Sequence, residues 1–101
     1  MNRANSYTTR AMRTRSEAGR RRVSCLSIVI EDNEGGYLAR CPGIQGVFAE
    51  GDSIEEAVFN CIDVVKMIAA YRKERGEPLR ASEFSFSPKT QLTIAMPVGL
   101  D

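Results

Sequence analysis

The chain contains no histidine, and this absence excludes several kinds of enzyme. Histidine is the usual general base of serine and cysteine hydrolases and a common metal ligand near neutral pH. The cysteines are widely spaced and form no Cys-x-x-Cys pair, which argues against a zinc site. The sequence also lacks a Gly-x-Ser-x-Gly elbow and a Gly-Lys-Ser phosphate loop. We therefore expect no catalytic residue, no metal and no cofactor, and we expect reduced thiols, with Cys25 and Cys61 as small core residues.

Long apolar runs are also missing. No segment approaches the ~20 apolar residues that cross a bilayer, and residues 1–22 lack the apolar region of a secretory signal. We expect a cytoplasmic protein that does not associate with membranes. The 101 residues are 43% hydrophobic and 27% charged, with no tryptophan, which is typical of one globular domain with a modest core.

The net charge of +1 conceals two regions of opposite sign. Residues 1–22 hold seven arginines and one glutamate, whereas the remaining chain holds seven Lys or Arg and twelve Asp or Glu. Residues 1–22 show no hydrophobic period, so we expect a basic, disordered or weakly helical arm before an acidic domain over residues 23–101. Such an arm is either a solvated tail or a contact to nucleic-acid phosphates. The candidate contacts are Arg13, Arg15, Arg20, Arg21 and Arg22.

Alternation of apolar and polar residues recurs through the acidic domain, as in half-buried strands. It predicts four strands, at residues 23–31, 37–41, 47–50 and 90–98. Residues 32–36 predict a hairpin loop, because asparagine and glycine accept a positive φ. A second tight connection contains Pro42, Gly43 and Gly46.

Ser53 begins the one predicted helix. The spacing of Ser53 and Glu56 matches a capping box, in which the serine hydroxyl accepts from the Glu56 amide and the glutamate reaches back to the Ser53 amide. Gly76 and Pro78 end the helix. Apolar residues recur between these points at spacings of three and four and define one stripe: Ile54, Ala57, Val58, Cys61, Ile62, Val65, Ile68 and Ala69. Three strands, this helix and a fourth strand predict a small α+β sandwich.

The most specific pattern runs from Gly36 to Ala57, as strand, glycine turn, strand and capped helix. Its Tyr-x-Ala strand, its Pro and Gly turns and its Gly-Asp-Ser-x-x-Glu-Ala helix start resemble the HicB family of antitoxins. The resemblance covers about half the chain, residues 24–76. It implies an antiparallel β-β-β-α-β sheet with one long helix packed on it, in a degraded RNase H-like core. The residues that carry it are small and structural: Gly43, Gly46, Gly51, Asp52, Ser53 and Glu56.

The resemblance implies an antitoxin of a type II toxin–antitoxin system. Its partner would be a small, basic, HicA-like mRNA-cleaving toxin, and the chain itself would form a homodimer or a dimer of dimers. Many relatives carry a C-terminal DNA-binding domain, but this sequence stops at Asp101, so we expect the core domain alone. The candidate partner-binding residues are Tyr37, Pro42, Ile44, Phe48, Phe84 and Phe86, of which Phe84 and Phe86 alternate in a predicted connection as if along a sheet edge.

Two other functions stay open. The arginine-rich arm could make the chain a stand-alone nucleic-acid-binding module, or carboxylates could form a residual RNase H-like nuclease with two metal ions. The available carboxylates are Glu31, Asp32, Glu50, Asp52, Glu55, Glu56 and Asp63. Helix capping and surface solvation explain most of them, so we expect a protein that is not an enzyme.

Overall fold

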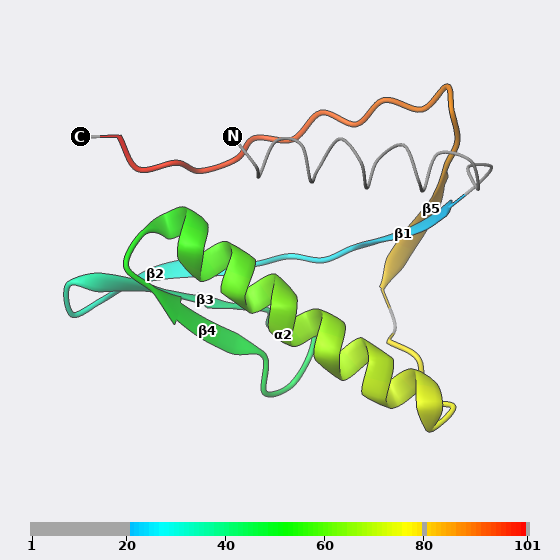
Figure 1. Ribbon diagram of the computed structural model, residues 1–101, viewed down its shortest axis with the longest axis horizontal. Coiled ribbons are helices and arrows are strands. Elements are labelled where there is room, and N and C mark those ends of the chain that lie inside the picture. Colours follow the sequence, from blue (N-terminus) through cyan, green and yellow to red (C-terminus); the bar gives the residue numbers. More distant parts are fainter. Residues whose placement is uncertain (1–20, 80, 101) are drawn as a thin grey trace, which may run out of the picture. The chain divides into compact units, whose positions relative to one another are not determined.

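The computed structural model describes residues 21–79 and 81–100 (Figure 1). The described elements are strands β1 (Arg21–Cys25), β2 (Val29–Asn33), β3 (Gly36–Arg40) and β4 (Phe48–Gly51), helix α2 (Ile54–Glu74) and strand β5 (Ser82–Phe86). The strands form two small sheets, one with the order β1-β5 and one with the order β2-β3-β4. The α+β class is confirmed, although the five strands are divided between two antiparallel sheets.

The chain divides into two compact units. Of the described residues, the β1–β5 unit comprises 21–24 and 83–93, and the helical unit comprises 25–79, 81–82 and 94–100. The helical unit contains α2 and the three-stranded sheet. Among the described residues, none of the helices has the length and apolar character needed to cross a membrane.

The β2–β3 hairpin is tighter than predicted. Asn33 pairs with Gly36, so only Glu34 and Gly35 remain for the turn. Their φ values of 48° and 95° are both positive, as in a type I′ turn, which matches the twist of the flanking strands. The predicted loop over 32–36 is thus two residues long, and Glu34 rather than asparagine takes the left-handed conformation.

Helix α2 begins at the predicted capping box. The Glu56 amide donates to Ser53 Oγ at 3.1 Å. The Glu56 carboxylate accepts from the Asp52 amide at 2.5 Å, one residue before the amide that the sequence indicated. Both interactions satisfy backbone donors that the first helical turn leaves without partners.

The end of α2 forms a Schellman motif around Gly76. The Gly76 amide donates to the Lys73 carbonyl at 3.1 Å, and the Glu77 amide donates to the Arg72 carbonyl at 2.8 Å. Gly76 has a φ of 72°, which glycine adopts without a Cβ penalty. The predicted helix end is confirmed.

The core lies between α2 and the three-stranded sheet (Figure 1). Gly51 allows this close packing, since a Cβ at that position would overlap the backbone of Glu56 and Ala57. The helix packs chiefly on β4 and β3 and only slightly on β2. The buried residues of this core are Ala39, Cys41, Ile44, Val47, Ala57, Cys61 and Val65, and Val58 of α2 is buried as well.

Three predictions about strands were wrong. Residues 23–31 do not form one strand, because β1 pairs with β5 while β2 belongs to the other sheet. Residues 79–88 are not merely a connection, since they contain β5. Residues 90–98 show the alternation of a strand, yet they lie in no strand of the described chain. A strand needs a paired neighbour as well as a pattern, and residues 90–98 pair with no strand among the described residues.

Candidate protein-binding surface

One face of the three-stranded sheet is turned away from α2. Ala39 is completely buried on the helix side, and its partners across the strands are Ile30 and Ala49. Because successive side chains of a strand point to opposite faces, the intervening residues lie on the other side. They form two cross-strand rows, Glu31–Leu38–Glu50 and Val29–Arg40–Phe48. We call these six residues the outer face.

An ion pair crosses the outer face diagonally. The Arg40 guanidinium donates to Glu31 Oε2 from Nη2 at 3.0 Å and from Nε at 3.2 Å. Both side chains are close to half exposed, so the pair contributes little to folding stability. Across the strands, Arg40 is the partner of Phe48, which is 60% exposed. Exposed aromatic and arginine side chains are enriched in protein interfaces.

A shallow hollow of about 290 Å³ adjoins Phe48. The loop after β3 forms one wall, and backbone hydrogen bonds fix this loop: Cys41 donates to the Val47 carbonyl at 3.1 Å, and Ile44 donates to the Cys41 carbonyl at 3.0 Å. Ile44 is 4% exposed and anchors the loop in the core. The lining residues are Leu38, Arg40, Cys41, Pro42, Ile44, Gln45, Gly46, Val47 and Phe48.

The predicted partner-binding residues fall in three places. Pro42, Ile44 and Phe48 line the hollow together, although Ile44 is almost entirely buried. Tyr37 lies on the helix side of the sheet and packs partly against the core. The remaining pair, Phe84 and Phe86, belongs to β5, with ring centroids 6.3 Å apart. The structure therefore joins three of the six predicted residues in one surface.

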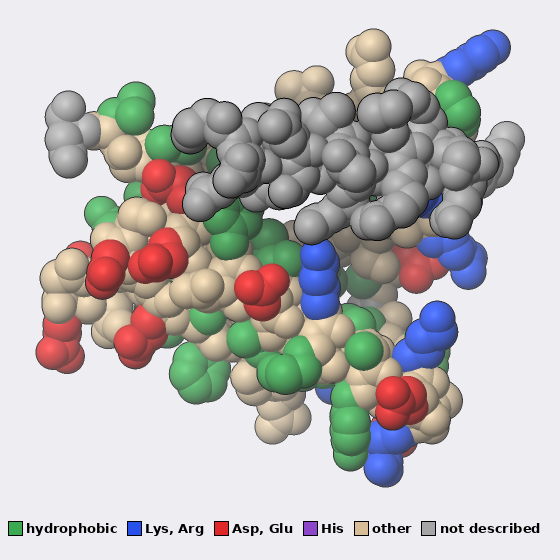
Figure 2. All heavy atoms as spheres, in the orientation of Figure 1, with side chains coloured by type: hydrophobic (Ala, Val, Ile, Leu, Met, Phe, Trp, Pro, Cys, Tyr) green, Lys and Arg blue, Asp and Glu red, His purple; other side chains and the backbone are tan. Residues whose placement is uncertain are grey.

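Acidic side chains concentrate beside the outer face. Residues 31–56 contain seven Asp or Glu and one basic residue, Arg40. Figure 2 shows red side chains gathered around the start of α2 and the β2–β3 hairpin. A polar hollow of about 440 Å³ lies there, lined by the hairpin turn and by Glu50, Asp52, Glu56 and Asn60. Basic residues Arg72 and Lys73 lie at the opposite end of α2, so the helical unit is electrostatically polarised.

Two carboxylates of this region interact with other protein groups and do not converge on one point. Glu56 caps the helix, and Glu31 pairs with Arg40. Within the part of the chain that the structure describes, no cluster of three or more His, Cys, Asp or Glu side chains is arranged to hold a metal ion.

The cysteines differ in their surroundings. Cys41 and Cys61 are buried in the core, whereas Cys25 is exposed, so the expectation of a buried Cys25 was wrong. Cys25 lies at the end of β1, in the small sheet, where the core does not cover it. Burial, and secondarily the neighbouring Cys41, raises the pKa of the Cys61 thiol. A thiol with a raised pKa stays protonated and is a poor nucleophile.

Part of the candidate nucleic-acid surface lies outside the described residues, namely Arg13, Arg15 and Arg20. Arg21 and Arg22 begin β1. The Arg22 guanidinium lies 3.6 Å from the Glu83 carboxylate on β5, with the arginine side chain 84% exposed. This weak pair leaves most of the Arg22 side chain accessible to solvent.

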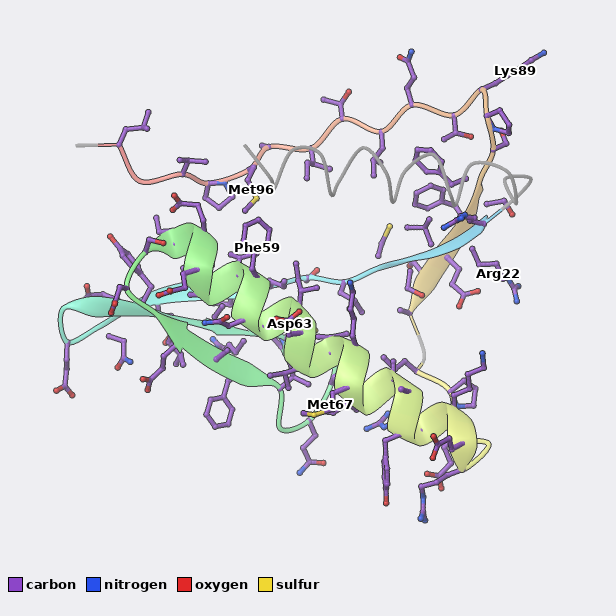
Figure 3. All side chains as sticks on the ribbon, in the orientation of Figure 1. Arg22, Phe59, Asp63, Met67, Lys89 and Met96 are labelled. Carbon is purple, nitrogen blue, oxygen red and sulfur yellow. The ribbon has the colours of Figure 1, made fainter. Side chains whose placement is uncertain are left out.

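Sequence reasoning missed an exposed apolar row on α2. Phe59, Met67 and Tyr71 are each 58–65% exposed. Asp63 lies between Phe59 and Met67 on the same side of the helix (Figure 3). Their spacing in the sequence could have revealed this row. Phe59 and Met67 are eight residues apart and Met67 and Tyr71 are four apart, so they share one side of the helix, outside the apolar stripe that packs on the sheet.

Comparisons with known families, with curated proteins and with solved structures find no match for this chain.

Proposed function

We propose that this chain is a HicB-like antitoxin that acts in the cytoplasm by binding a small, basic, HicA-like mRNA-cleaving toxin. The outer face and its hollow are the contact surface in this proposal. The observation that carries it is the exposed Phe48 ring, set beside an apolar hollow and bordered by a strongly acidic region. An apolar centre with a charged rim is the usual composition of a protein interface.

The charge distribution supports a basic partner. The stretch between positions 31 and 56, which includes most of the outer-face residues, holds seven acidic residues and one basic residue, a net charge of −6. The Glu50 carboxylate lies on that face and makes no ion pair with any residue that the structure describes. Complementary charge accelerates encounter and disfavours acidic partners, while apolar burial at Phe48 slows dissociation.

The finer fold assignment is part of the same proposal. The order β2-β3-β4-α2, with its capped helix start, agrees with the three strands and helix that the HicB resemblance implies. The fourth strand of that pattern is not paired in the described chain. We assign the helical unit to a degraded RNase H-like core on this partial agreement, and we assign no catalytic role to it.

Growth rescue tests the proposal. The chain is co-expressed with a HicA-like toxin, taken first from the neighbouring reading frame if it encodes a short basic protein. The intact chain should restore growth, and Phe48→Asp should abolish rescue because it places a charge at the centre of the apolar contact. Phe59→Asp is the matched control: Phe59 is 58% exposed, close to the 60% of Phe48, but lies on α2.

Thermal melts establish that both variants remain folded. Loss of rescue by Phe48→Asp with rescue retained by Phe59→Asp supports the outer face. Equal rescue by both variants rejects it, and failure of the intact chain to bind the neighbouring basic protein rejects the antitoxin assignment.

A second function, nucleic-acid binding through the arm, rests on the seven arginines of residues 1–22. Each neutralised phosphate of duplex DNA contributes a slope of about −0.9 to the dependence of log affinity on log salt. Replacing Arg13, Arg15 and Arg20 with serine should reduce that slope by about 2.7 if all three contact phosphates. An unchanged slope, measured by fluorescence anisotropy, excludes these contacts.

A further inference from the structure

The C-terminal segment, residues 90–100, has the alternation of a strand but forms no ladder. Residues 91–100 belong to no strand of the described chain. Its large apolar side chains are exposed to solvent: Leu92 56%, Ile94 67%, Met96 37%, Val98 49% and Leu100 88%. A contiguous apolar row of this size is uncommon on a monomer and marks an interaction site.

Residues 94–100, the part of this segment that belongs to the helical unit, lie beside α2 and not beside a strand. The Gly99 amide donates to Glu55 Oε1 at 3.3 Å, which holds the segment beside the first turn of α2. Phe59 lies one turn further along the helix and is 58% exposed, and Figure 3 shows its ring pointing toward Met96. The solvent side of a helix presents no strand edge. Among the described residues, the backbone of residues 91–98 is therefore paired with no strand.

The three-stranded sheet has strand edges that lack a neighbouring strand. Its order leaves β2 and β4 with an unpaired edge each. Because α2 packs chiefly on β4 and β3, the helix side of the sheet is least covered near β2. Leu26, Ile28 and Ile30 lie there against the core and remain only partly buried. An additional strand beside β2 would pair its backbone groups and cover this apolar row.

We propose that two copies of this chain exchange their C-terminal segments, with residues 90–98 of each copy forming a fourth strand along β2 of the other. The exchange is reciprocal, so it closes after two copies and produces no open-ended filament. The side of the added strand that carries Leu92, Ile94 and Met96 would face Leu26, Ile28 and Ile30 of the partner. This inference does not depend on the proposed toxin-binding function, because it uses a different surface.

The apolar area is sufficient for a stable dimer. Fully burying a side chain of this class removes roughly 60–120 Å² from water, as its transfer free energy indicates. Four such side chains lie on one side of each added strand: Leu92, Ile94, Met96 and Val98. With matching area on the receiving surfaces and a discount for the part already buried, the two segments supply on the order of 1,000 Å². A specific interface requires roughly 1,000 Å².

Light scattering of the full chain, combined with hydrogen exchange, tests the exchange. The intact chain should show twice the 11.2 kDa mass of one chain, with slow exchange at the amides of residues 92–98. Ile94→Asp should halve the mass and release that protection, because it places a carboxylate in the apolar row. Thr93→Asp is the matched control, since Thr93 points to the opposite face of the added strand, and its mass should stay that of the dimer.

Protection of the α2 amides between Ala57 and Val65 reports folding in each variant, and Leu92→Asp repeats the test if Ile94→Asp unfolds. A dimer that persists in both variants overturns the proposal. A monomeric intact chain also overturns it, and protected amides at 92–98 in that monomer would show that the segment pairs within its own chain. Dissociation of Thr93→Asp to the same extent as Ile94→Asp contradicts the assigned orientation.

Discussion

The amide of Glu56 donates to the hydroxyl of Ser53 at 3.1 Å, while the Glu56 carboxylate accepts from the amide that precedes Ser53. Two residues three positions apart thereby satisfy two backbone donors at the start of α2. This start is also where β4, the acidic hollow and the Gly99 contact meet. The cap consequently helps to position β4, the acidic hollow and the Gly99 contact as well as the first turn of α2.

Ser53→Ala should lower the free energy of unfolding by about 0.5–2 kcal/mol without changing the fold, since it removes the acceptor for the Glu56 amide. Urea melts followed by circular dichroism measure the change. Ser27→Ala is the control, because Ser27 is exposed and makes no hydrogen bond with the described residues, and it should shift stability by less than about 0.5 kcal/mol. Equal midpoints for the intact chain and Ser53→Ala would remove the capping assignment.

Gly51→Ala should destabilise the chain by roughly 1–3 kcal/mol, because the added methyl group would overlap the backbone of Glu56 and Ala57. Gly43→Ala is a matched comparison: a Cβ at Gly43 meets no atom within 4 Å. Its stability should lie within about 0.5 kcal/mol of that of the intact chain. If the two variants melt together, α2 does not approach β4 as closely as the structure indicates.

Alkylation should distinguish the cysteines. Cys25 is exposed and should react with iodoacetamide first, whereas Cys41 and Cys61 should react only as the chain unfolds. The raised pKa of Cys61 means that the folded state retains its proton where the unfolded thiol begins to ionise. Folding stability should therefore decline as pH rises above about 8.5, the ordinary cysteine pKa. Mass spectrometry after timed quenching measures the order in which the three cysteines are labelled. Rapid labelling of Cys61 in the folded chain would contradict its burial.

The purified chain should not cleave RNA or DNA in the presence of Mg²⁺ or Mn²⁺. Glu56 is used in the helix cap and Glu31 in the ion pair with Arg40, so these carboxylates do not converge on a metal. Gel assays with labelled substrates measure cleavage. Activity that follows the protein through purification and disappears in Asp52→Asn or Glu31→Gln would establish a nuclease instead.

The elements that sequence predicted well are those specified by near neighbours. The Ser53–Glu56 spacing locates the start of α2, and Gly76 locates its end, because capping partners lie within a few residues. The predicted strands at 37–41 and 47–50 agree with β3 and β4 to within one residue at each end.

Assembly of the sheets could not be predicted in the same way. Alternation continues through residues 23–31, yet the pairing of β1 with β5 divides this stretch between two sheets. The same alternation over residues 90–98 predicted a strand, although these residues pair with no strand edge of the described chain. The burial of Ile44 and the exposure of Phe48, four residues apart, likewise depend on tertiary packing and not on local sequence.

Methyl chemical-shift mapping of the full chain against the HicA-like toxin tests the central claim most directly. We predict that the methyl resonances of Val29 and Leu38, on the outer face, shift or broaden on binding. The Met67 methyl resonance, on the exposed side of α2, should remain unchanged. Perturbation confined to Met67 and to the C-terminal segment, with Val29 and Leu38 unaffected, would contradict the assignment of the outer face as the toxin-binding surface.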